Sequence, residues 1–376
     1  MKILSLFDGI SIAQQALKNL GVKVDEYYAS EVDKYAIQIT QKNFPNTIQL
    51  GDVKELKIKS IERDEDGIDL YNTELLIGGS PCQDLSIAKK NREGLKGSRS
   101  GLFYEYKRIL EEVKPRYFVL ENVNSMPKEA RAEITKELFG IEPIMINASL
   151  VSAQNRKRLF WIGKFWSKDG AYGYEKVEIP QPEDRGVLLR DILEDNPAIA
   201  PVKSNTIRTS GRGSGLGDKH NWDTIRIGQI GKGGQGDRIY SPDGKSVNLS
   251  ANGEGRGAKT GLYAVALTET RTEKAKKIRS EHYKKTGKDW SPRFEKELQI
   301  RKDNKSNTIT TGNTKESLIL LNTIIRKLTP TECCRLQSLP DGYCDGVSAT
   351  QQYKALGNGF NCAVIEHILK NIIKQK

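Results

Sequence analysis

The sequence has few cysteines and histidines. Its 376 residues include five cysteines and three histidines, and no two cysteines stand in a C-x-x-C spacing. An odd number of cysteines without framework spacing argues against a disulfide scaffold and against a structural zinc site. It favours a reducing compartment, so we expect a cytoplasmic protein that holds no metal.

Long apolar runs are also missing. No stretch approaches the roughly 20 apolar residues that a membrane-spanning helix needs, and the opening MKILSLFDGI turns polar too early for a signal peptide. What the chain does have is positive charge, with 60 Lys and Arg against 48 Asp and Glu and a formal net charge of +12. No basic amphipathic helix accompanies this excess, which favours nucleic acid over a membrane as the partner.

The first 165 residues alternate short β-prone runs with helical patterns. This alternation is typical of an α/β fold with a parallel sheet. A closing β-hairpin is expected from EPIMINASLVS and RLFWIGKF, with Asn155 in its turn. The predicted parallel strands are KILSLF, VDEYYASEV, TIQLGDV, TELLIGGS and PRYFVLENV, and the predicted helices cover 12–21, 33–44 and 101–114.

The middle of the chain has a different texture. Residues 210–261 hold 14 of the 34 glycines, so long regular elements are not expected there. Three segments share a Lys-Ser start and a β-prone centre, namely KSNTIRTSG (203–211), KSVNLSANG (245–253) and KSNTITTGN (305–313). They suggest hairpin-like units of a small β-rich domain, or chance similarity among polar loops. Residues 271–306 carry 13 Lys and Arg against 6 Asp and Glu, and predict a basic helix-and-loop excursion.

Polar residues follow the predicted strands at the ends that share one sheet edge. Phe7, Asp8 and Gly9 follow the first strand, Glu31 the second and Asp52 the third. Such a turn offers backbone N–H groups to a nucleoside, and a carboxylate after the second strand can accept from ribose hydroxyls. The turn is not G-x-G-x-x-G, because Ser11 stands where a second glycine is usual, so an ordinary βα turn is the alternative.

A second group of reactive residues belongs to the same edge. Cys82 follows the fourth strand in GGSPCQDLS, and Glu121 ends the fifth strand in FVLENV. A loop thiol is nucleophilic where its surroundings favour the thiolate, although a lone cysteine is more often a buried packing residue. Arg156 and Arg158 are two apart in QNRKR and are expected to face one side. Together these residues suit attack on an electron-poor ring whose developing charge needs stabilisation.

The motifs as a set resemble the C5-specific DNA cytosine methyltransferase family. They are FDG, Glu31, GDV, GGSPCQDLS, ENV, QNRKR, LTPTECCRLQSLP and QYKALGNG, in the family's order, and they cover nearly all of residues 1–165 and 326–376. The N-terminal motifs are most similar to the de novo branch, and the glycine-rich middle to bacterial and phage enzymes. Gly359 stands where a serine is common in the family.

This resemblance implies an S-adenosylmethionine-dependent Rossmann-like fold with a smaller β-rich target-recognition domain. It implies a domain over 1–165, completed by 345–376, that holds the cofactor and the chemistry, and a recognition domain over 166–344. Cys82 is then the nucleophile that adds to C6 of a flipped-out cytosine, Glu121 bonds the base, and Arg158 and Arg156 hold the base and the Cys82 loop. The implied S-adenosylmethionine site consists of Phe7, Asp8, Gly9, Ile10, Ser11, Glu31, Asp52, Val53, Ser80, Pro81, Asn358 and Gly359.

Double-stranded DNA is the implied partner, and a cognate restriction endonuclease encoded nearby is a further candidate. The loop after Cys82 resembles a mobile lid that contacts phosphates, and base readout is expected from the recognition domain. The candidate DNA-binding residues are Arg92, Lys96, Ser98, Arg208, Arg212, Arg226, Arg238, Asn252 and Arg256. Cys333, Cys334 and Cys362 are expected to pack in helices.

Three other functions are weaker explanations of the same residues. An RNA cytosine methyltransferase would have a compact recognition region and a Cys-Phe-Thr signature, and neither is present here. A DNA-binding scaffold derived from the family would lose its Pro-Cys or Glu-Asn-Val residues, and both motifs are intact. A dinucleotide oxidoreductase does not explain the Pro-Cys loop.

Overall fold

The computed structural model describes residues 1–59, 67–80, 102–194, 226–229, 238–240, 244–247, 262–271, 273–287, 296–300, 323–326 and 328–374. The chain divides into two compact units. Unit 1 comprises Met1–Ile192, Lys245–Lys259 and Pro330–Lys376, and unit 2 comprises Leu193–Gly244 and Thr260–Thr329.

Unit 1 is built on an eight-stranded sheet in the order β3-β2-β1-β4-β5-β7-β6, with β8 paired to β7. Its five parallel strands confirm the predicted parallel sheet. They are β1 (Lys2–Leu6), β2 (Glu26–Ser30), β3 (Ile48–Gln49), β4 (Leu75–Gly79) and β5 (Tyr117–Val123). The remaining strands run antiparallel and include the predicted closing hairpin. They are β6 (Ile144–Asn147), β7 (Lys157–Lys168) and β8 (Ala171–Lys176).

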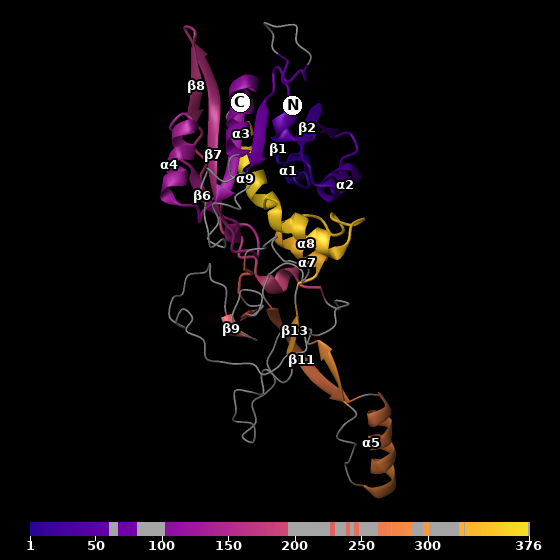
Figure 1. Cartoon of the computed structure of the whole chain (residues 1–376). Coiled ribbons are helices and arrows are strands. Elements are labelled where there is room, and N and C mark those ends of the chain that lie inside the picture. The colour runs from indigo at the N-terminus through magenta and orange to yellow at the C-terminus, as the bar shows by residue number, and fades with distance from the viewer. Residues whose placement is uncertain are drawn as a thin grey trace. The chain divides into compact units, whose positions relative to one another are not determined.

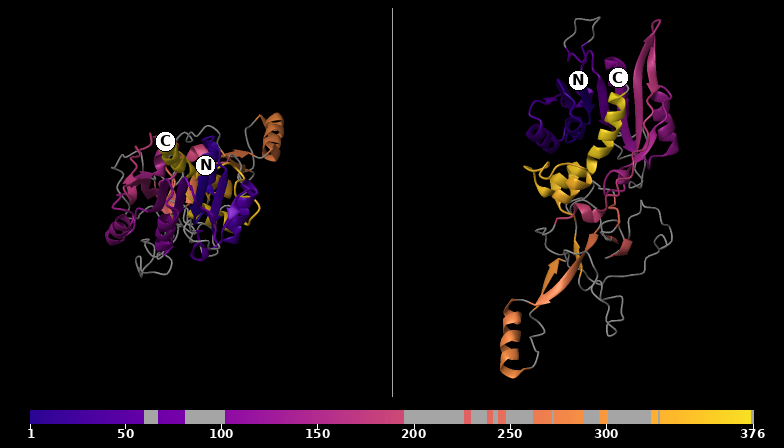
Figure 2. Two further views of the ribbon diagram at one scale, coloured as in Figure 1. Left: turned by 90° about the horizontal axis from the view of Figure 1, so that it is seen from above. Right: turned by 180° about the vertical axis from the view of Figure 1, so that it is seen from behind.

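Helices cover both faces of this sheet (Figures 1 and 2). The longer ones are α1 (Ile12–Asn19), α2 (Lys34–Asn43), α3 (Leu102–Val113), α4 (Lys128–Glu137), α8 (Ala349–Asn358) and α9 (Cys362–Ile373). Shorter turns are η1 (Val53–Glu55), η3 (Ala148–Leu150), η4 (Leu189–Ile192) and α7 (Pro330–Leu336). Helices α1, α2 and α3 fall within the predicted helical segments 12–21, 33–44 and 101–114.

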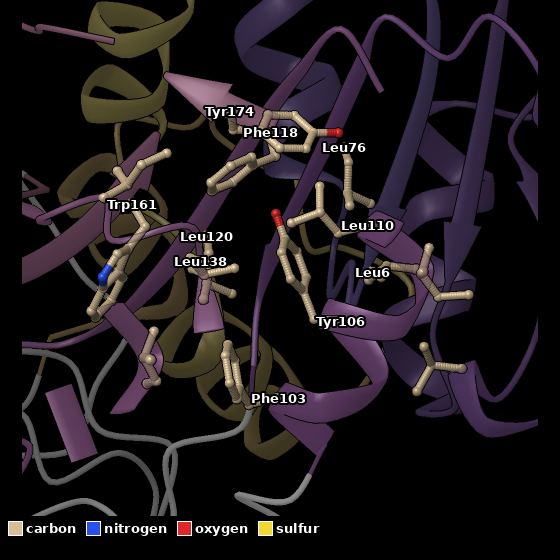
Figure 3. Packing of buried hydrophobic residues seen from close by; sticks show 14 of the residues in the cluster. Leu6, Leu76, Phe103, Tyr106, Leu110, Phe118, Leu120, Leu138, Trp161 and Tyr174 are labelled. Atoms are coloured by element: carbon tan, nitrogen blue, oxygen red, sulfur yellow. The ribbon is translucent and has the colours of Figure 1, made fainter. Parts of the chain in front are cut away.

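The main core lies between one face of the sheet and helices α3 and α4 (Figure 3). Because side chains alternate along a strand, Leu4 and Leu6 point to this face while Ile3 points to the other. Phe103 and Tyr106 of α3 are completely buried there. On the opposite face α1 packs against α9, whose apolar residues are buried. This packing fixes the C-terminal segment beside β1 and its following turn.

The bounds of unit 1 differ from the domain boundaries predicted at residues 165 and 345. Strand β8 continues the sheet through its pairing with β7, so the sheet does not end at residue 165. Helix α7 belongs to unit 1, with Cys333 and Cys334 buried in it. Cys333, Cys334 and Cys362 are packing residues, as predicted, and with Cys344 they are free thiols.

Unit 2 is rich in β-structure, as the sequence predicts. Its sheet has the order β12-β11-β10-β9, with β13 also paired to β11, and Glu273–Thr286 of the basic segment form α5. The repeats at 203–211 and 305–313 lie outside the described residues. The strands are β9 (Arg226–Gln229), β10 (Arg238–Tyr240), β11 (Leu262–Arg271), β12 (Lys296–Ile300) and β13 (Thr323–Arg326).

Two features are absent from the described residues. Across those ranges, no helix has both the length and the apolarity needed to traverse a bilayer. The same part of the chain contains no cluster of three or more His, Cys, Asp or Glu side chains arranged to hold a metal ion.

Candidate active site

The site lies at the carboxyl ends of the parallel strands. The strand order reverses between β1 and β4, and this is the position at which open α/β sheets bind ligands. A cavity of about 420 Å³ occupies it. The cavity brings together twelve of the residues predicted from the sequence, namely Phe7, Asp8, Gly9, Glu31, Asp52, Val53, Ser80, Glu121, Arg156, Arg158, Asn358 and Gly359.

The turn after β1 is held in an uncommon backbone conformation. Phe7, Gly9 and Ser11 all have positive φ, near 56°, 62° and 54°, which is rare for residues other than glycine. Asp8 stabilises the turn from within. Its carboxylate accepts hydrogen bonds from the hydroxyls of Tyr27 (2.8 Å) and Ser11.

Asp8 is therefore bonded on the inner side of the turn. Burial raises the pKa of Asp8, while the hydrogen bonds from Ser11, Ser5 and Tyr27 lower it. Predicted cofactor residues Ile10 and Ser11 are fully buried and do not line the cavity. The structure gives Asp8 and Ser11 a part in shaping the turn that presents Gly9.

Glu31 is fixed at the end of β2 by backbone donors. Its Oε2 accepts from the amide of Gly9 at 2.8 Å, and its Oε1 accepts from the amides of Val32 (2.7 Å) and Asp33 (2.8 Å). A carboxylate with three amide donors is held in one orientation. Since it lines the cavity, it presents a preorganised acceptor beside the turn of β1.

Asp52 and Val53 form the next part of the wall. Asp52 caps η1 by accepting from the amide of Lys54 at 3.0 Å, and its side chain is exposed at the cavity. Val53 is buried. The carboxylates of Glu31 and Asp52 therefore follow adjacent strands along one edge, as predicted.

The segment that leads into the Pro-Cys motif is closely packed. A Cβ on Gly78 would lie 2.7 Å from the carbonyl oxygen of Leu6, and a Cβ on Gly79 would lie 3.0 Å from Oε2 of Glu121. Ser80 is held by Asn122, whose Nδ2 donates to its Oγ at 3.1 Å. The residues that follow lie outside the described ranges and include the predicted Pro81, Cys82, Arg92, Lys96 and Ser98.

Glu121 and Arg158 form an ion pair at the cavity. Nε of Arg158 donates to Oε1 of Glu121 at 2.7 Å, with the side chains 14% and 13% exposed. They meet because β5 and β7 are antiparallel neighbours, with Val123 opposite Arg158. A carboxylate held by a guanidinium in a partly desolvated cavity can bond a polar ring edge in a fixed direction.

Arg156 lies just before β7 and is 3% exposed. It lines the same cavity as Arg158, but its guanidinium contacts the backbone of the C-terminal segment. Its Nη2 donates to the carbonyl of Gly359 at 2.7 Å and to that of Gly357 at 3.4 Å. Arg156 thus joins the QNRKR motif to the LGNG motif, a contact between residues 203 apart in sequence.

The C-terminal segment supplies the last wall. Asn358 is exposed to the cavity, and Gly359 packs so closely that a Cβ would lie 2.6 Å from Cδ1 of Ile12. A serine at this position would require Ile12 to move. The glycine in place of the family's common serine therefore fits the packing of this chain.

Several cavity residues were missed by sequence reasoning. Phe360, Gln351 and Tyr35 line it, and Lys354 pairs with Asp33 at 2.6 Å across its rim. Asn122 is fully buried and positions Ser80. The quoted ENV and QYKALGNG motifs contain Asn122 and Lys354, so these two could have been found.

Two of the predicted DNA-contacting residues fall on strands of unit 2. Arg238 begins β10 and Arg226 begins β9, and Arg226 is opposite Tyr240 in the antiparallel pair. The side chain of Arg226 is outside the described residues, as are Arg208, Arg212, Asn252 and Arg256.

Comparison with known proteins identifies the family of this chain. The profile of the family described as C-5 cytosine-specific DNA methylase matches residues 1–374. The chain is 27% identical over 384 residues to the type II methyltransferase M.HhaI of Haemophilus parahaemolyticus, covering 99% of this chain and 94% of that protein. It is 26% identical over 445 residues to the orphan methyltransferase M.SPRI of Bacillus phage SPR, covering 99% and 97%.

Solved structures show the same fold. The Entamoeba histolytica methyltransferase EhMeth superposes with a TM-score of 0.60 at 16% identity, covering 100% of this chain and 98% of that one. The S. pombe Dnmt2 methyltransferase gives 0.56 at 16% identity, covering 100% and 99%. The fold is thus that of S-adenosylmethionine-dependent methyltransferases. Because the family profile spans almost the whole sequence, the chain belongs to the C-5 cytosine-specific DNA methylases, enzymes that methylate DNA cytosine with S-adenosylmethionine.

Proposed function

We propose that Cys82, Glu121, Arg158 and Arg156 carry out the methylation of C5 in a flipped-out cytosine within a short sequence of duplex DNA. The observation that supports this most directly is the Glu121–Arg158 ion pair, which lies in one cavity with Ser80, the residue two positions before Cys82. The side-chain amide of Asn122 donates to the hydroxyl of Ser80. The residue two positions before the thiol is therefore held at that cavity.

The cavity fits S-adenosylmethionine. The fixed carboxylate of Glu31 suits a ribose hydroxyl pair, the exposed carboxylate of Asp52 suits an amino group, and the turn at Gly9 allows close backbone approach. When bound, this cofactor supplies an electrophilic methyl group on a sulfonium. The proposed binding residues are Phe7, Asp8, Gly9, Ile10, Ser11, Glu31, Asp52, Val53, Ser80, Pro81, Asn358 and Gly359, with Asp8, Ile10 and Ser11 acting through the shape of the turn.

The residues then act on the base in a fixed order. The Cys82 thiolate adds to C6 of cytosine, and the electron pair of the C5–C6 double bond becomes available at C5. Glu121 hydrogen-bonds the N3 and exocyclic amine edge, where charge develops, and Arg158 holds Glu121 in place. Once C5 carries its methyl group, loss of the C5 proton and expulsion of the thiolate restore the ring and the free enzyme.

Unit 2 is the proposed target-recognition region. Its Arg208, Arg212, Arg226 and Arg238, together with Asn252 and Arg256 of the 245–259 segment of unit 1, supply side chains suited to guanine edges or phosphates. Arg92, Lys96 and Ser98, which follow Cys82, contact phosphates. We also propose that the protein works in the cytoplasm, and that a cognate restriction endonuclease is encoded nearby.

Methyl transfer from tritium-labelled S-adenosylmethionine to mixed duplex DNA and to tRNA tests the assignment. We expect label in DNA alone, and bisulfite sequencing should place it on cytosines of one short motif. Label in tRNA but not in DNA would assign the enzyme to RNA. DNA binding without transfer to either substrate would show that the motifs belong to a scaffold.

Replacing Glu31 with glutamine should weaken cofactor binding. The amide has one acceptor oxygen in place of two, so it cannot keep the bonds to Gly9, Val32 and Asp33 and also accept from a ribose. Loss of a charged hydrogen-bond acceptor costs about 1.5–3 kcal/mol, which predicts a Kd for S-adenosylmethionine raised about 10- to 100-fold. Isothermal titration calorimetry measures this, and Glu129→Gln on the exposed face of α4 is the matched control. An unchanged Kd would remove Glu31 from the cofactor site.

A further inference from the structure

A short piece of the glycine-rich region belongs to unit 1. Residues 245–247 are part of it, and Ser246 forms a parallel bridge with Gln154. The amide of Ser246 donates to the carbonyl of Ala153 at 2.7 Å, and the amide of Asn155 donates to the carbonyl of Ser246 at 2.9 Å. These bonds lie on the residues that directly precede Arg156, so this piece supports the segment that carries the arginines.

Lys245 is buried at the same place. It is 2% exposed, although lysine is among the residues least often buried without a partner. Its ammonium donates to the carbonyls of Ser152 (3.4 Å) and Val187. Burial lowers the pKa of Lys245, and the carboxylates of Asp184 and Asp191 act in the opposite direction. A buried ammonium that donates to two carbonyls fixes the backbone around it, because removing it leaves acceptors without a donor.

Ser152 links this lysine to the C-terminal segment. Its hydroxyl donates to the carbonyl of Ala148 at 3.0 Å and accepts from Nδ2 of Asn361 at 3.2 Å. Asn361 also donates to the carbonyl of Leu336 and caps α9 by accepting from the amide of Val364. Ser152 therefore contacts both Lys245 and the segment that carries Gly357 and Gly359.

Arg156 completes the same connection from the other side. Its amide donates to Oδ1 of Asn147 at 3.0 Å, and its guanidinium reaches the carbonyls of Gly357 and Gly359 at the cavity. Lys245, Ser152 and Asn361 thus form a set of hydrogen-bonded contacts that reaches the C-terminal segment to which Arg156 also bonds. The set runs from a piece of the glycine-rich region to the wall of the methyl-transfer site.

We propose that Lys245 is a positioning residue that sets Arg156, and through it the Gly357–Gly359 wall, for methyl transfer. The inference rests on the proposed function of this cavity. It gives the Lys-Ser start of KSVNLSANG a role that a chance repeat does not have. It also means that the glycine-rich region acts on the catalytic step from within unit 1.

Lys245→Met tests the proposal, because it keeps the length of the side chain and removes the donor. We expect kcat to fall on the order of 10- to 100-fold, the cost of a small misplacement of a catalytic group. The rate is counted per active site, titrated by covalent trapping on DNA that contains 5-fluorocytosine. Lys136→Met, at an exposed position of α4, is the matched control and should keep the rate within twofold. Arg156→Lys should lower kcat by a similar factor. The double variant should have a kcat little lower than that of Arg156→Lys alone.

Three outcomes would overturn the inference. The first is a wild-type rate per trapped site in Lys245→Met, and the second is an equal rate in the Lys136→Met and Lys245→Met variants. The third is a rate loss in the double variant equal to the combined losses of Lys245→Met and Arg156→Lys. If Lys245→Met does not fold, Ser152→Ala supplies the same test, because it removes the hydroxyl link to Asn361 and keeps the carbonyl. It should lower the rate per site and show the same non-additivity. Failure of the wild type to methylate DNA would instead overturn the proposed function, so the two failures are distinct.

Discussion

Replacing Cys82 with serine is expected to abolish methylation, with a loss of turnover on the order of 10⁴- to 10⁶-fold, as for other enzymes that lose their nucleophile. A thiol with an ordinary pKa near 8.5 supplies thiolate near neutral pH, and a basic or hydrogen-bonding setting increases it. A serine hydroxyl has no comparable anionic population and needs an adjacent base. Adduct formation at C6 therefore stops while the cavity itself is retained.

The measurement combines three quantities on the same Cys82→Ser preparation. Methyl transfer and covalent trapping on 5-fluorocytosine DNA should be lost, whereas the Kd for S-adenosylmethionine should stay within about twofold, because the cofactor contacts do not involve the sulfur. Cys362→Ala is the matched control, since Cys362 is fully buried in α9. It should lower the free energy of unfolding by about 1 kcal/mol and still methylate DNA. Residual turnover above about 1% in Cys82→Ser would assign the nucleophile to another residue.

The strand ends were predictable because their chemistry is local in sequence. Glu31 and Glu121 each end an apolar β-prone run, and parallel strands place such ends at one edge. The cavity therefore contains the acidic residues named from the sequence. The pairing partner of each one was not predictable. The bond from Tyr27 to Asp8 depends on the register of β1 and β2, which sets Lys2 opposite Glu26.

Long-range contacts explain the remaining differences. Arg156 lines the same cavity as Arg158, as predicted, but it lies before β7 and its guanidinium bonds Gly357 and Gly359, about 200 residues away. No local pattern encodes that distance. The sequence around Lys245 has the composition of a polar loop, and only the fold shows that Lys245 is buried beside Ser152. The unit bounds differ from the boundary predicted at 165 because β7 spans that residue, continues to Lys168 and pairs with β8.

Replacing Glu121 with glutamine should lower kcat about 10²- to 10³-fold, within the range expected for a general acid or base. Glutamine keeps the size of the side chain, but it loses the charge that pairs with Arg158 and the ability to move between carboxylate and carboxylic acid. The N3 edge of the base then meets a neutral amide as adduct charge develops. Single-turnover methyl transfer measures this loss directly, because it excludes product release.

A second variant separates catalysis from stability. In Glu121→Gln the guanidinium of Arg158, 14% exposed, loses its charged partner, so we expect the free energy of unfolding to fall by about 1–3 kcal/mol. Adding Arg158→Met removes the unpaired charge and should recover most of that stability. Methyl transfer should not recover, because neither variant restores a group for N3. If stability and rate recovered together, the ion pair would serve the fold alone. A rate that stays low in the stabilised double variant would place Glu121 in the reaction itself.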